Sequence, residues 1–334
     1  MPKLTRRRFV THAAAAAALS GATGPAFTAA HAQGADGWPN RPVRFIVPLA
    51  PGGAIDYIAR AVGERMSHVI GQQVVVENRT GAGGTIGMDA ALKSTPDGYT
   101  VLITNDNAAS APHIMKLSYD YTRELLPVCL LGRHGIILAA HASLGVRSVA
   151  ELVAYAKANP GLGLATSGVG SNQHVLCEWF KREAQVKIDH VPYRGAGQAV
   201  NDLVAAHVKT AMLGPTSLIP HAEAGTLRLL AQSSEKRGST LPDVPTLQEA
   251  GFKGLVLEAW YGAFVPPGTP AAIVARLNEE INKALKDAKL TDTFRKGAIE
   301  PVGGSGDDLG RLAQSDSEKY ARLVRELNIA TGIN

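Results

Sequence analysis

The chain alternates short apolar runs with amphipathic segments, and this alternation limits the folds that it can adopt. Three strand-like runs lie at 44–47, 74–76 and 99–103. A helix at about 55–69 separates the first two runs and carries its apolar residues on one face. Loops rich in Gly and Pro join the strands to the helices. This β-loop-α-β order predicts a parallel sheet that is covered by helices on both faces.

The same pattern repeats from about residue 135. Further strands are expected at 136–140, 162–165, 188–191, 210–213 and 227–231. Ser148 and Glu151 form a capping box at a helix start, and Thr269 is expected to cap a helix over 270–286. An extended segment at 255–265 is predicted to return to the first sheet, and the chain is expected to end in a helix.

Two such blocks predict an α/β fold of two lobes, each a mostly parallel sheet flanked by helices. Of the 334 residues, 302 follow position 32, which is more than a single hydrophobic core usually supports. We expect residues 33–134 and 258–334 to form a discontinuous first lobe, and residues 135–257 to form the second. Open α/β sheets bind ligands outside the carboxyl ends of their strands, so we expect the ligand in a cleft between the lobes.

The first 32 residues have the features of a secretory signal peptide. A basic segment at Arg6–Arg8 precedes an Ala-rich apolar stretch over 9–19, and Ala30-His31-Ala32 fits an A-x-A cleavage site. The apolar stretch is shorter than the roughly 20 residues that span a bilayer. We therefore expect export to the periplasm with cleavage near Ala32. The arginines fit both a twin-arginine signal and an Arg-rich Sec signal, so the route stays open.

Removing this segment also changes the charge of the chain. Four of the 34 Lys and Arg residues lie within 1–32 and none of the 29 Asp and Glu residues do, which leaves 30 cations against 29 anions. A surface that binds nucleic acid would need clustered cations in the exported part. We therefore expect no nucleic-acid partner, and we expect a monomer.

The two cysteines, Cys129 and Cys177, leave two interpretations open. An even count permits one disulfide in an oxidising compartment. Both residues nevertheless lie in apolar surroundings, one in a strand-like run and one on the apolar side of a predicted helix, so two buried free thiols fit as well. There is no C-x-x-C pair and the ten histidines show no ligand spacing. We expect no metal and no cofactor.

Four loops between a strand and the next helix are rich in small residues. They span 48–56, 78–84, 166–171 and 192–196. Glycine lets a ligand approach the main chain, and the N–H groups at the start of the following helix suit a carboxylate. One such loop alone is typical of a tight turn. Four of them at strand ends favour a cleft that binds a small anion.

The common enzyme motifs are not present in the sequence. The segment Gly81–Gly87 resembles a dinucleotide fingerprint but has Ile86 where glycine is required. No Walker A, G-x-S-x-G or H-E-x-x-H sequence occurs. Ser171 and His174 could touch, but a capping serine beside a helical histidine is the commoner arrangement, and no orienting acid is evident. We expect no catalytic residues.

Arg194 is the charged residue with the clearest potential role in binding. In a Gly-flanked loop it could hold a carboxylate bidentately, or it could form a salt bridge that fixes the loop. Asp56 lies at the start of the first helix, where an acidic cap is favoured, and it could also accept from a ligand.

Several motifs together resemble one family. They are Trp38-Pro39-x-Arg41-Pro42-Val43-Arg44-x-Ile46-Val47-Pro48, Ala50-Pro51-Gly52-Gly53-x-x-Asp56, Val76-Glu77-Asn78-Arg79-x-Gly81-Ala82-Gly83-Gly84-x-x-Gly87, Pro96-Asp97-Gly98-Tyr99-Thr100, Gly168-x-Gly170-Ser171-x-x-His174 and His190-Val191-Pro192-Tyr193-Arg194-Gly195. These motifs are similar to those of the Bug family, the extracytoplasmic solute receptors of tripartite tricarboxylate transporters. They follow the same order over essentially the whole exported chain.

This resemblance implies a two-lobed periplasmic-binding-protein fold that closes on its ligand by hinge motion. It also implies small carboxylate ligands, such as citrate-like acids, dicarboxylates, acidic amino acids and aromatic acids, and a membrane permease as partner. The residues implicated by position are Ala54, Asp56, Ser167, Gly168, Gly170, Ser171, Tyr193, Arg194, Gly195 and Ala196.

The sequence departs from the family pattern in the first loop. Leu49 stands where an aromatic residue is common, and Ala54-Ile55 replace Gly followed by Thr or Ser. These changes favour an apolar or aromatic acid over citrate. A receptor that reports its ligand to a sensor kinase, and a periplasmic hydrolase on the same scaffold, are the alternative functions.

Overall fold

A computed structural model describes residues 37–117 and 119–330 of the chain. The internal contacts of the chain divide it into two units, with the boundary between residues 36 and 37. Every element described below belongs to the unit that begins at Gly37. The predicted signal peptide over residues 1–32 lies outside the described residues. Among the residues that are described, no helix is both long and apolar enough to cross a membrane.

The first sheet has six strands in the order β11-β4-β10-β3-β1-β2. Their bounds are β1 Val43–Val47, β2 Val74–Asn78, β3 Thr100–Asn105, β4 Leu126–Gly135, β10 Glu258–Val265 and β11 Glu300–Pro301. β1 pairs in parallel with β2 and β3, whereas β10 runs antiparallel to β3 and β4. The predicted return of the segment 255–265 to this sheet is confirmed, and the returning strand lies in the middle of the sheet.

The second sheet has five strands in the order β7-β6-β8-β5-β9. Their bounds are β5 Ile137–His141, β6 Leu162–Thr166, β7 Ile188–Pro192, β8 Thr210–Leu213 and β9 Leu227–Gln232. β6 is parallel to β7 and β8, and β5 is antiparallel to β8 and β9. Both sheets are therefore mixed. The predicted parallel pairing holds among β1, β2 and β3 and among β6, β7 and β8, whereas β5, β10 and β11 pair antiparallel with their neighbours.

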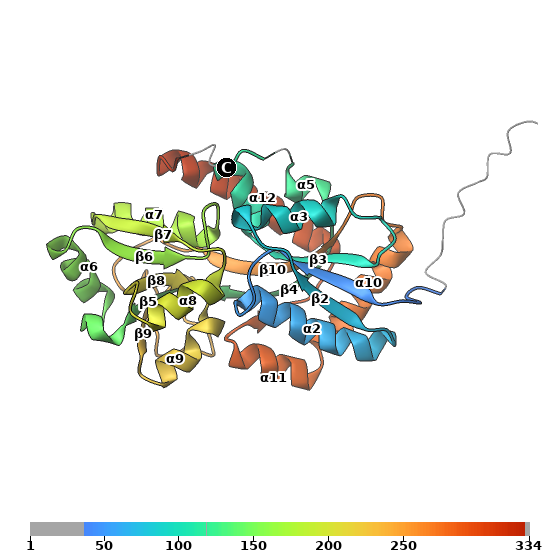
Figure 1. The fold of residues 1–334 in the computed structure, drawn as a ribbon, viewed down its shortest axis with the longest axis horizontal. Helices are drawn as coiled ribbons and strands as arrows, with labels where there is room; N and C mark the ends of the chain where they lie inside the picture. Colours follow the sequence, from blue (N-terminus) through green and yellow to red (C-terminus); the bar gives the residue numbers. More distant parts are fainter. Residues whose placement is uncertain (1–36, 118, 331–334) are drawn as a thin grey trace, which may run out of the picture. The chain divides into compact units, whose positions relative to one another are not determined.

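Helices cover both faces of each sheet (Figure 1). Their bounds are α2 Ala54–Ile70, α3 Thr85–Leu92, α4 Asn107–Ile114, α5 Tyr121–Glu124, α6 Val149–Ala158, α7 Asn172–Ala184, α8 Ala196–Val204, α9 Ile219–Glu223, α10 Ala271–Leu285, α11 Ala288–Lys296 and α12 Gly306–Glu326. Short 3-10 turns lie at Ala82–Gly84, Ala142–Leu144 and Pro215–Ser217. The predicted α/β architecture of two helix-flanked sheets is confirmed.

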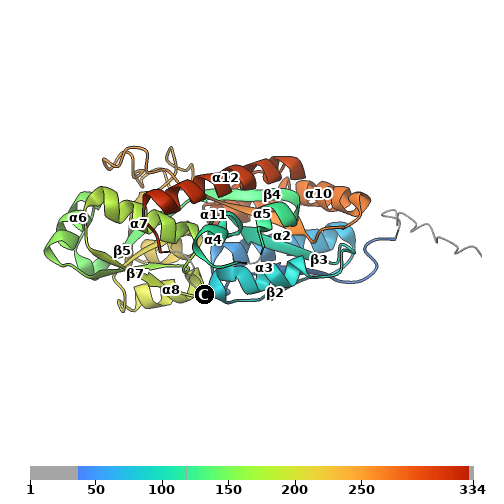
Figure 2. The same ribbon diagram turned by 90° about the horizontal axis from the view of Figure 1, so that it is seen from above.

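The alternation of apolar residues along the strands divides the core. On β1, Val43, Phe45 and Val47 pack with α2 and α10 on one face, whereas Ile46 faces a core that contains residues of α3, α4 and α12. That second core continues into the second sheet, where it includes Leu138. Figure 2 shows α12 extending past β4 towards α7, which it contacts. The two sheets are therefore joined by packing as well as by the chain.

Two segments carry the chain between the sheets, and Ser233 joins them. The backbone N–H of Ile136 donates to Ser233 Oγ at 2.8 Å, and that of Ser233 donates to the Ile136 carbonyl at 2.8 Å. Ser233 Oγ also donates to the carbonyl of Leu257. The strands of the first sheet come from 43–135 and 258–301 and those of the second from 137–232, whereas the lobe boundaries themselves stay a prediction.

Helix ends follow the sequence in part. Ser148 Oγ accepts from the N–H of Glu151 as predicted, but the Glu151 carboxylate accepts from Arg147 rather than from Ser148. Thr269 does not cap α10: its hydroxyl donates to the carbonyl of Pro266, and Pro270 occupies the cap position. Residues 267–268 form a turn, and the Thr269 hydroxyl reaches back across it to the Pro266 carbonyl.

Candidate functional site

Hydrogen bonds to the Asp56 carboxylate fix the loop after β1. The N–H of Gly52 donates to Asp56 Oδ2 at 3.2 Å, and Asn78 Nδ2 donates to Asp56 Oδ1 at 3.0 Å. The side chain of Arg60 donates to both carboxylate oxygens, each at 3.1 Å. Asn78 also donates to the carbonyl of Leu49 at 3.0 Å. Because these partners occupy the buried carboxylate, Asp56 anchors the loop to α2 and β2.

The loop after β7 touches the loop after β1. A side chain at Gly195 would lie 3.0 Å from the backbone nitrogen of Ala50, and one at Gly197 would clash with the carbonyl oxygen of Pro51. Glycine at these positions therefore lets the main chains of the two loops meet. Ala54 faces Gly214, which follows β8, at 3.5 Å from the position a side chain would take there. Strand ends of both sheets thus converge.

The loop after β6 is fixed by its own side chains. Ser171 Oγ accepts from the N–H of His174 at 3.1 Å and donates to the carbonyl of Gly168 at 2.7 Å. The N–H of Ser167 donates to Gln173 Oε1 at 2.9 Å. Gly168 has φ +135°, and a side chain there would lie 2.7 Å from the carbonyl oxygen of Tyr193. Ser171 is thus a helix cap, and Gly168 brings this loop onto the loop after β7.

A cavity of about 210 Å³ lies where these loops meet. It is lined by Gly81, Ala82, Gly83, Met115, Gly168, Val169, Pro192, Tyr193 and Arg194. The wall thus combines a loop that follows β2 with loops that follow β6 and β7. A side chain at Gly83 would lie 2.6 Å from the carbonyl oxygen of Val169, so loops belonging to the two sheets are in close contact at this wall.

Arg194 supplies the cation of this cavity. No carboxylate oxygen lies within 4.0 Å of its guanidinium in the described part of the chain. The neighbouring Tyr193 hydroxyl is committed elsewhere, since it donates to Asp202 Oδ2 at 2.7 Å. Burial and this carboxylate raise the pKa of Tyr193 to about 12. An exposed arginine without an acidic partner, among main-chain loops, suits a carboxylate ligand.

Two larger hollows lie elsewhere. One of about 470 Å³ lies beside α2 and α11 and touches only Asp56 among the predicted site residues. The other, of about 670 Å³, lies beside the crossing segments near His134 and Trp260 and contains none of them. The smaller cavity is therefore the candidate site, because it lies at the carboxyl ends of β2, β6 and β7 and holds three predicted residues.

A polar cluster that the sequence did not indicate follows β3. Asp106 is fully buried; its carboxylate accepts from Tyr320 and, at 2.8 Å, from Asn172 Nδ2. Burial raises the pKa of Asp106 to about 8. Three buried atoms of this cluster have no hydrogen-bond partner among the described residues: Asn105 Oδ1, Asn107 Nδ2 and Asn172 Oδ1. The run of polar residues after a buried strand was the signal that could have found this cluster.

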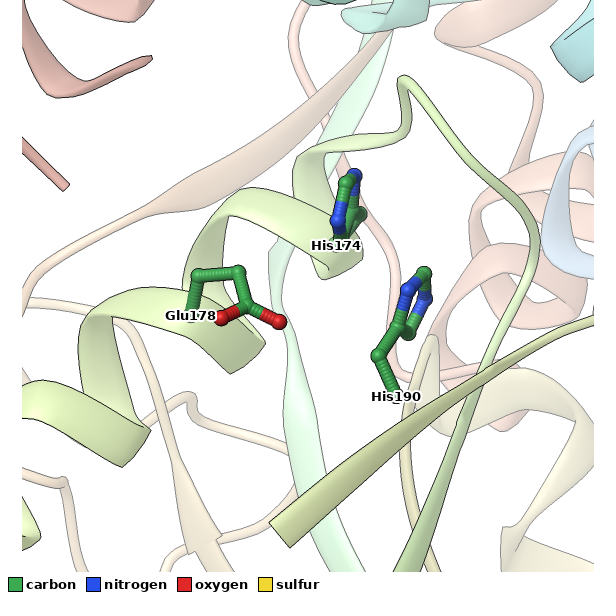
Figure 3. Close-up of side chains that lie close together, drawn as sticks. All are labelled: His174, Glu178 and His190. Atoms are coloured by element: carbon green, nitrogen blue, oxygen red, sulfur yellow. The ribbon is translucent and has the colours of Figure 1, made fainter. Parts of the chain in front are cut away.

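His174, Glu178 and His190 are close together below the loop after β6 (Figure 3). One ligand-type atom from each lies within 4.8 Å of the others. The two imidazoles are stacked with centroids 4.2 Å apart and planes at 11°. Their in-plane lone pairs therefore do not meet at one point, as shared coordination requires. These residues could hold a metal only if a ring turned.

Hydrogen bonds show what the two rings support instead. His190 Nε2 lies 2.6 Å from Thr166 Oγ1, and the N–H of Gly170 donates to His174 Nδ1 at 3.4 Å. Both contacts end on the loop after β6. No hydrogen bond joins the side chains of Ser171 and His174, so this pair lacks the link between nucleophile and base that catalysis requires.

Sequence comparison identifies the family. The sequence model of the tripartite tricarboxylate transporter family receptor matches residues 58–329. The chain belongs to this receptor family. A UPF0065 protein from the tcbD-tcbE intergenic region of Pseudomonas sp. is 38% identical over 301 residues, which are 89% of this chain and 90% of the relative. Protein BugT of Bordetella pertussis is 35% identical over 87% of this chain and 91% of its own length.

Solved structures of this receptor family share the fold. The periplasmic binding protein BugD is 30% identical with a TM-score of 0.85, covering 88% of this chain and all of BugD. R. palustris Rpa4515 with adipate is 33% identical with a TM-score of 0.85, over 88% and 99% of the two chains. MatC of Rhodopseudomonas palustris, with bound malate, is 29% identical with a TM-score of 0.82, over 86% and 100%. The chain is a solute-binding receptor with the periplasmic-binding-protein fold, as the motifs predicted.

Proposed function

We propose that this receptor captures a small organic carboxylate between its lobes and delivers it to the permease of a tripartite transporter. The Arg194 guanidinium at the 210 Å³ cavity, which has no acidic partner among the described residues, is the observation that carries this proposal. A carboxylate accepts two parallel hydrogen bonds from a guanidinium and further bonds from main-chain N–H groups. The adipate and malate in two structural relatives support the same ligand class.

Within the predicted site, we propose two kinds of role. Six residues present main-chain or side-chain atoms to the ligand: Ala54, Gly168, Gly170, Arg194, Gly195 and Ala196. Asp56, Ser171 and Tyr193 act behind them, because their polar atoms already bind protein groups. We propose the lobe boundaries of 134/135 and 257/258, and a monomer that closes by movement about the crossing segments.

We also propose that the chain is exported and that its signal peptide is removed near Ala32. The intact mass of the protein recovered from the periplasm tests the cleavage position directly. A mass that includes residues 1–32 would contradict it.

The ligand class is tested on the chain purified from the periplasm, by thermal shift and calorimetry against mono-, di- and tricarboxylates, sugars and cations. We expect at least one carboxylate to bind. Arg194→Ala should weaken that binding at least about tenfold. Arg147→Ala is the matched control, because Arg147 is another exposed arginine near the second sheet. Binding of a sugar or a cation alone would overturn the proposal.

A further inference from the structure

Asp106 is an unusual acid, because it is fully buried and no cationic side chain pairs with it in the described part of the chain. Its relative exposure is 0%, and no Lys, Arg or His nitrogen lies within 4.0 Å of its carboxylate among the described residues. Its partners are the neutral hydroxyl of Tyr320 and the neutral amide of Asn172. A buried carboxylate that lacks a cation is costly in its charged form.

These partners belong to elements around different sheets. Asp106 itself is the cap of α4, directly after β3 of the first sheet, and Tyr320 lies on α12. Asn172 is the first residue of α7, which follows β6 of the second sheet. Two further contacts join α4 to the start of α7 and to the loop before it. Ser110 Oγ donates to the Gly170 carbonyl at 2.6 Å, and the N–H of Asn172 meets Asn107 Oδ1 at 3.4 Å.

The surroundings of Asp106 favour its neutral form. From α12, Asp316 adds a second acid, which accepts from Trp260 Nε1 at 2.8 Å and whose pKa burial raises. From β10, Tyr261 is near, and its hydroxyl donates to His134 Nε2. The His134 ring is neutral, since burial lowers its pKa to about 4. Burial and Asp316 together outweigh the two hydrogen bonds and raise the pKa of Asp106 to about 8.

We propose that Asp106 is a positioning residue that joins the two lobes in its protonated form. The proton, taken up from solvent when the cleft closes, lies on Oδ2 and is shared with Tyr320 Oη, while Oδ1 still accepts from Asn172 Nδ2. Opening separates Asp106 from Asn172 and admits water, which stabilises the carboxylate. With Asp106 buried as in the structure, its pKa is raised to about 8, whereas contact with water in the open form brings the pKa back towards the ordinary value of about 3.9. The closed state is therefore favoured at low pH. Within this window, the ratio of closed to open molecules falls by up to about tenfold per pH unit.

The distance between the lobes tests this proposal without a ligand. Val75 on β2 of the first sheet and Lys157 on α6, beside the second sheet, are both exposed. Nitroxide labels at Val75→Cys and Lys157→Cys therefore report the distance between the lobes by double electron–electron resonance. The native cysteines are buried, and the parent protein without the added cysteines verifies that they stay unlabelled. We expect the short-distance population to fall steadily between pH 5 and pH 9.

Two variants link this change to Asp106. Asp106→Asn keeps the shape and is neutral throughout, so we expect its short-distance population to stay constant over the same range. Asn172→Ala removes the partner near the second sheet and should shift the distribution to long distances at every pH. Asn159→Ala, at an exposed helix end, is the control. The proposal is overturned if the parent distribution does not change with pH, or if Asp106→Asn follows the parent.

Discussion

His190 and Thr166 connect β7 to the loop that follows β6. Nε2 of His190 lies 2.6 Å from Oγ1 of Thr166, which also accepts from the N–H of Gly168 at 3.3 Å. The ring of His174 is stacked on that of His190, and its Nδ1 accepts from the N–H of Gly170. The two histidines thus hold the loop that contributes Gly168 to the cavity, although neither of them lines it.

Replacing Thr166 by Val should loosen this loop. The substitution keeps the shape but leaves the Gly168 N–H and His190 without their partner. We expect the free energy of unfolding in urea to fall by about 1–3 kcal/mol, and the affinity for the carboxylate ligand to fall as well.

Thr210→Val is the matched control for this loss. Thr210 Oγ1 donates to the carbonyl of Gly163 at 2.7 Å, within the same sheet but away from the loop. This variant should lose similar stability and keep its affinity. Equal affinities for both variants and the parent protein would show that the Thr166 contact does not position the loop.

The strands and the general position of the site could be predicted because they depend on local patterns. β8 was expected at its observed bounds, Thr210–Leu213. The carboxyl ends of parallel strands then place their loops at one edge. The pairing of His174 with His190 could not be predicted in the same way, because it depends on the register that sets Leu164 opposite His190. The register is the alignment of residues between two paired strands, and it is set by the tertiary packing rather than by the local sequence.

The roles of individual site residues were also beyond the sequence. Asp56 and Arg194 are both charged residues in glycine-rich loops. Only the packing shows that the Asp56 carboxylate binds Gly52, Arg60 and Asn78, whereas Arg194 has no acidic partner among the described residues. Asp106 follows a buried strand and was missed because its importance depends on Tyr320, more than 200 positions later in the chain.

The cysteines should be unreactive in the folded protein. Both are free and buried, and burial raises the pKa of each thiol to about 12. Since the thiolate is the reacting form, its fraction is reduced on the order of a thousandfold relative to an exposed cysteine. We expect no thiols to react with Ellman's reagent in buffer. Two should react in about 8 M urea, a concentration that unfolds most small domains. Absence of thiols in urea would show a disulfide instead.

The stability of the protein should depend on pH through the buried His134 and the partly buried His190. Burial lowers the pKa of His190 to about 3 and that of His134 to about 4. In the unfolded chain, each takes up a proton near its ordinary value of about 6.5. Their contribution is thus fully present above pH 6.5 and is lost as the pH falls towards 4, by up to about 1.4 kcal/mol per unit for each group.

Urea unfolding between pH 7 and pH 4.5 measures this loss. His190→Gln should reduce the slope of stability against pH, and His68→Gln, which removes an exposed histidine of α2, is the comparison variant. Asp106 acts with the opposite sign, because its raised pKa favours the folded state at low pH. Asp106 is present in each variant and in the parent protein, so its contribution to the stability cancels when they are compared at the same pH. An unchanged slope in His190→Gln would mean that His190 titrates alike in both states.

The contact between the loops after β1 and β7 should be sensitive to a single methyl group. A side chain at Gly197 would clash with the carbonyl oxygen of Pro51, so Gly197→Ala prevents these loops from approaching. Gly197 lies within α8, where alanine is favoured over glycine by about 1 kcal/mol. We therefore expect the helix preference to offset part of the cost of the clash, while the ligand affinity falls at least about tenfold. Gln198→Ala, on the exposed side of the same helix, is the control and should bind normally. If Gly197→Ala also binds normally, the loops do not need to meet for capture.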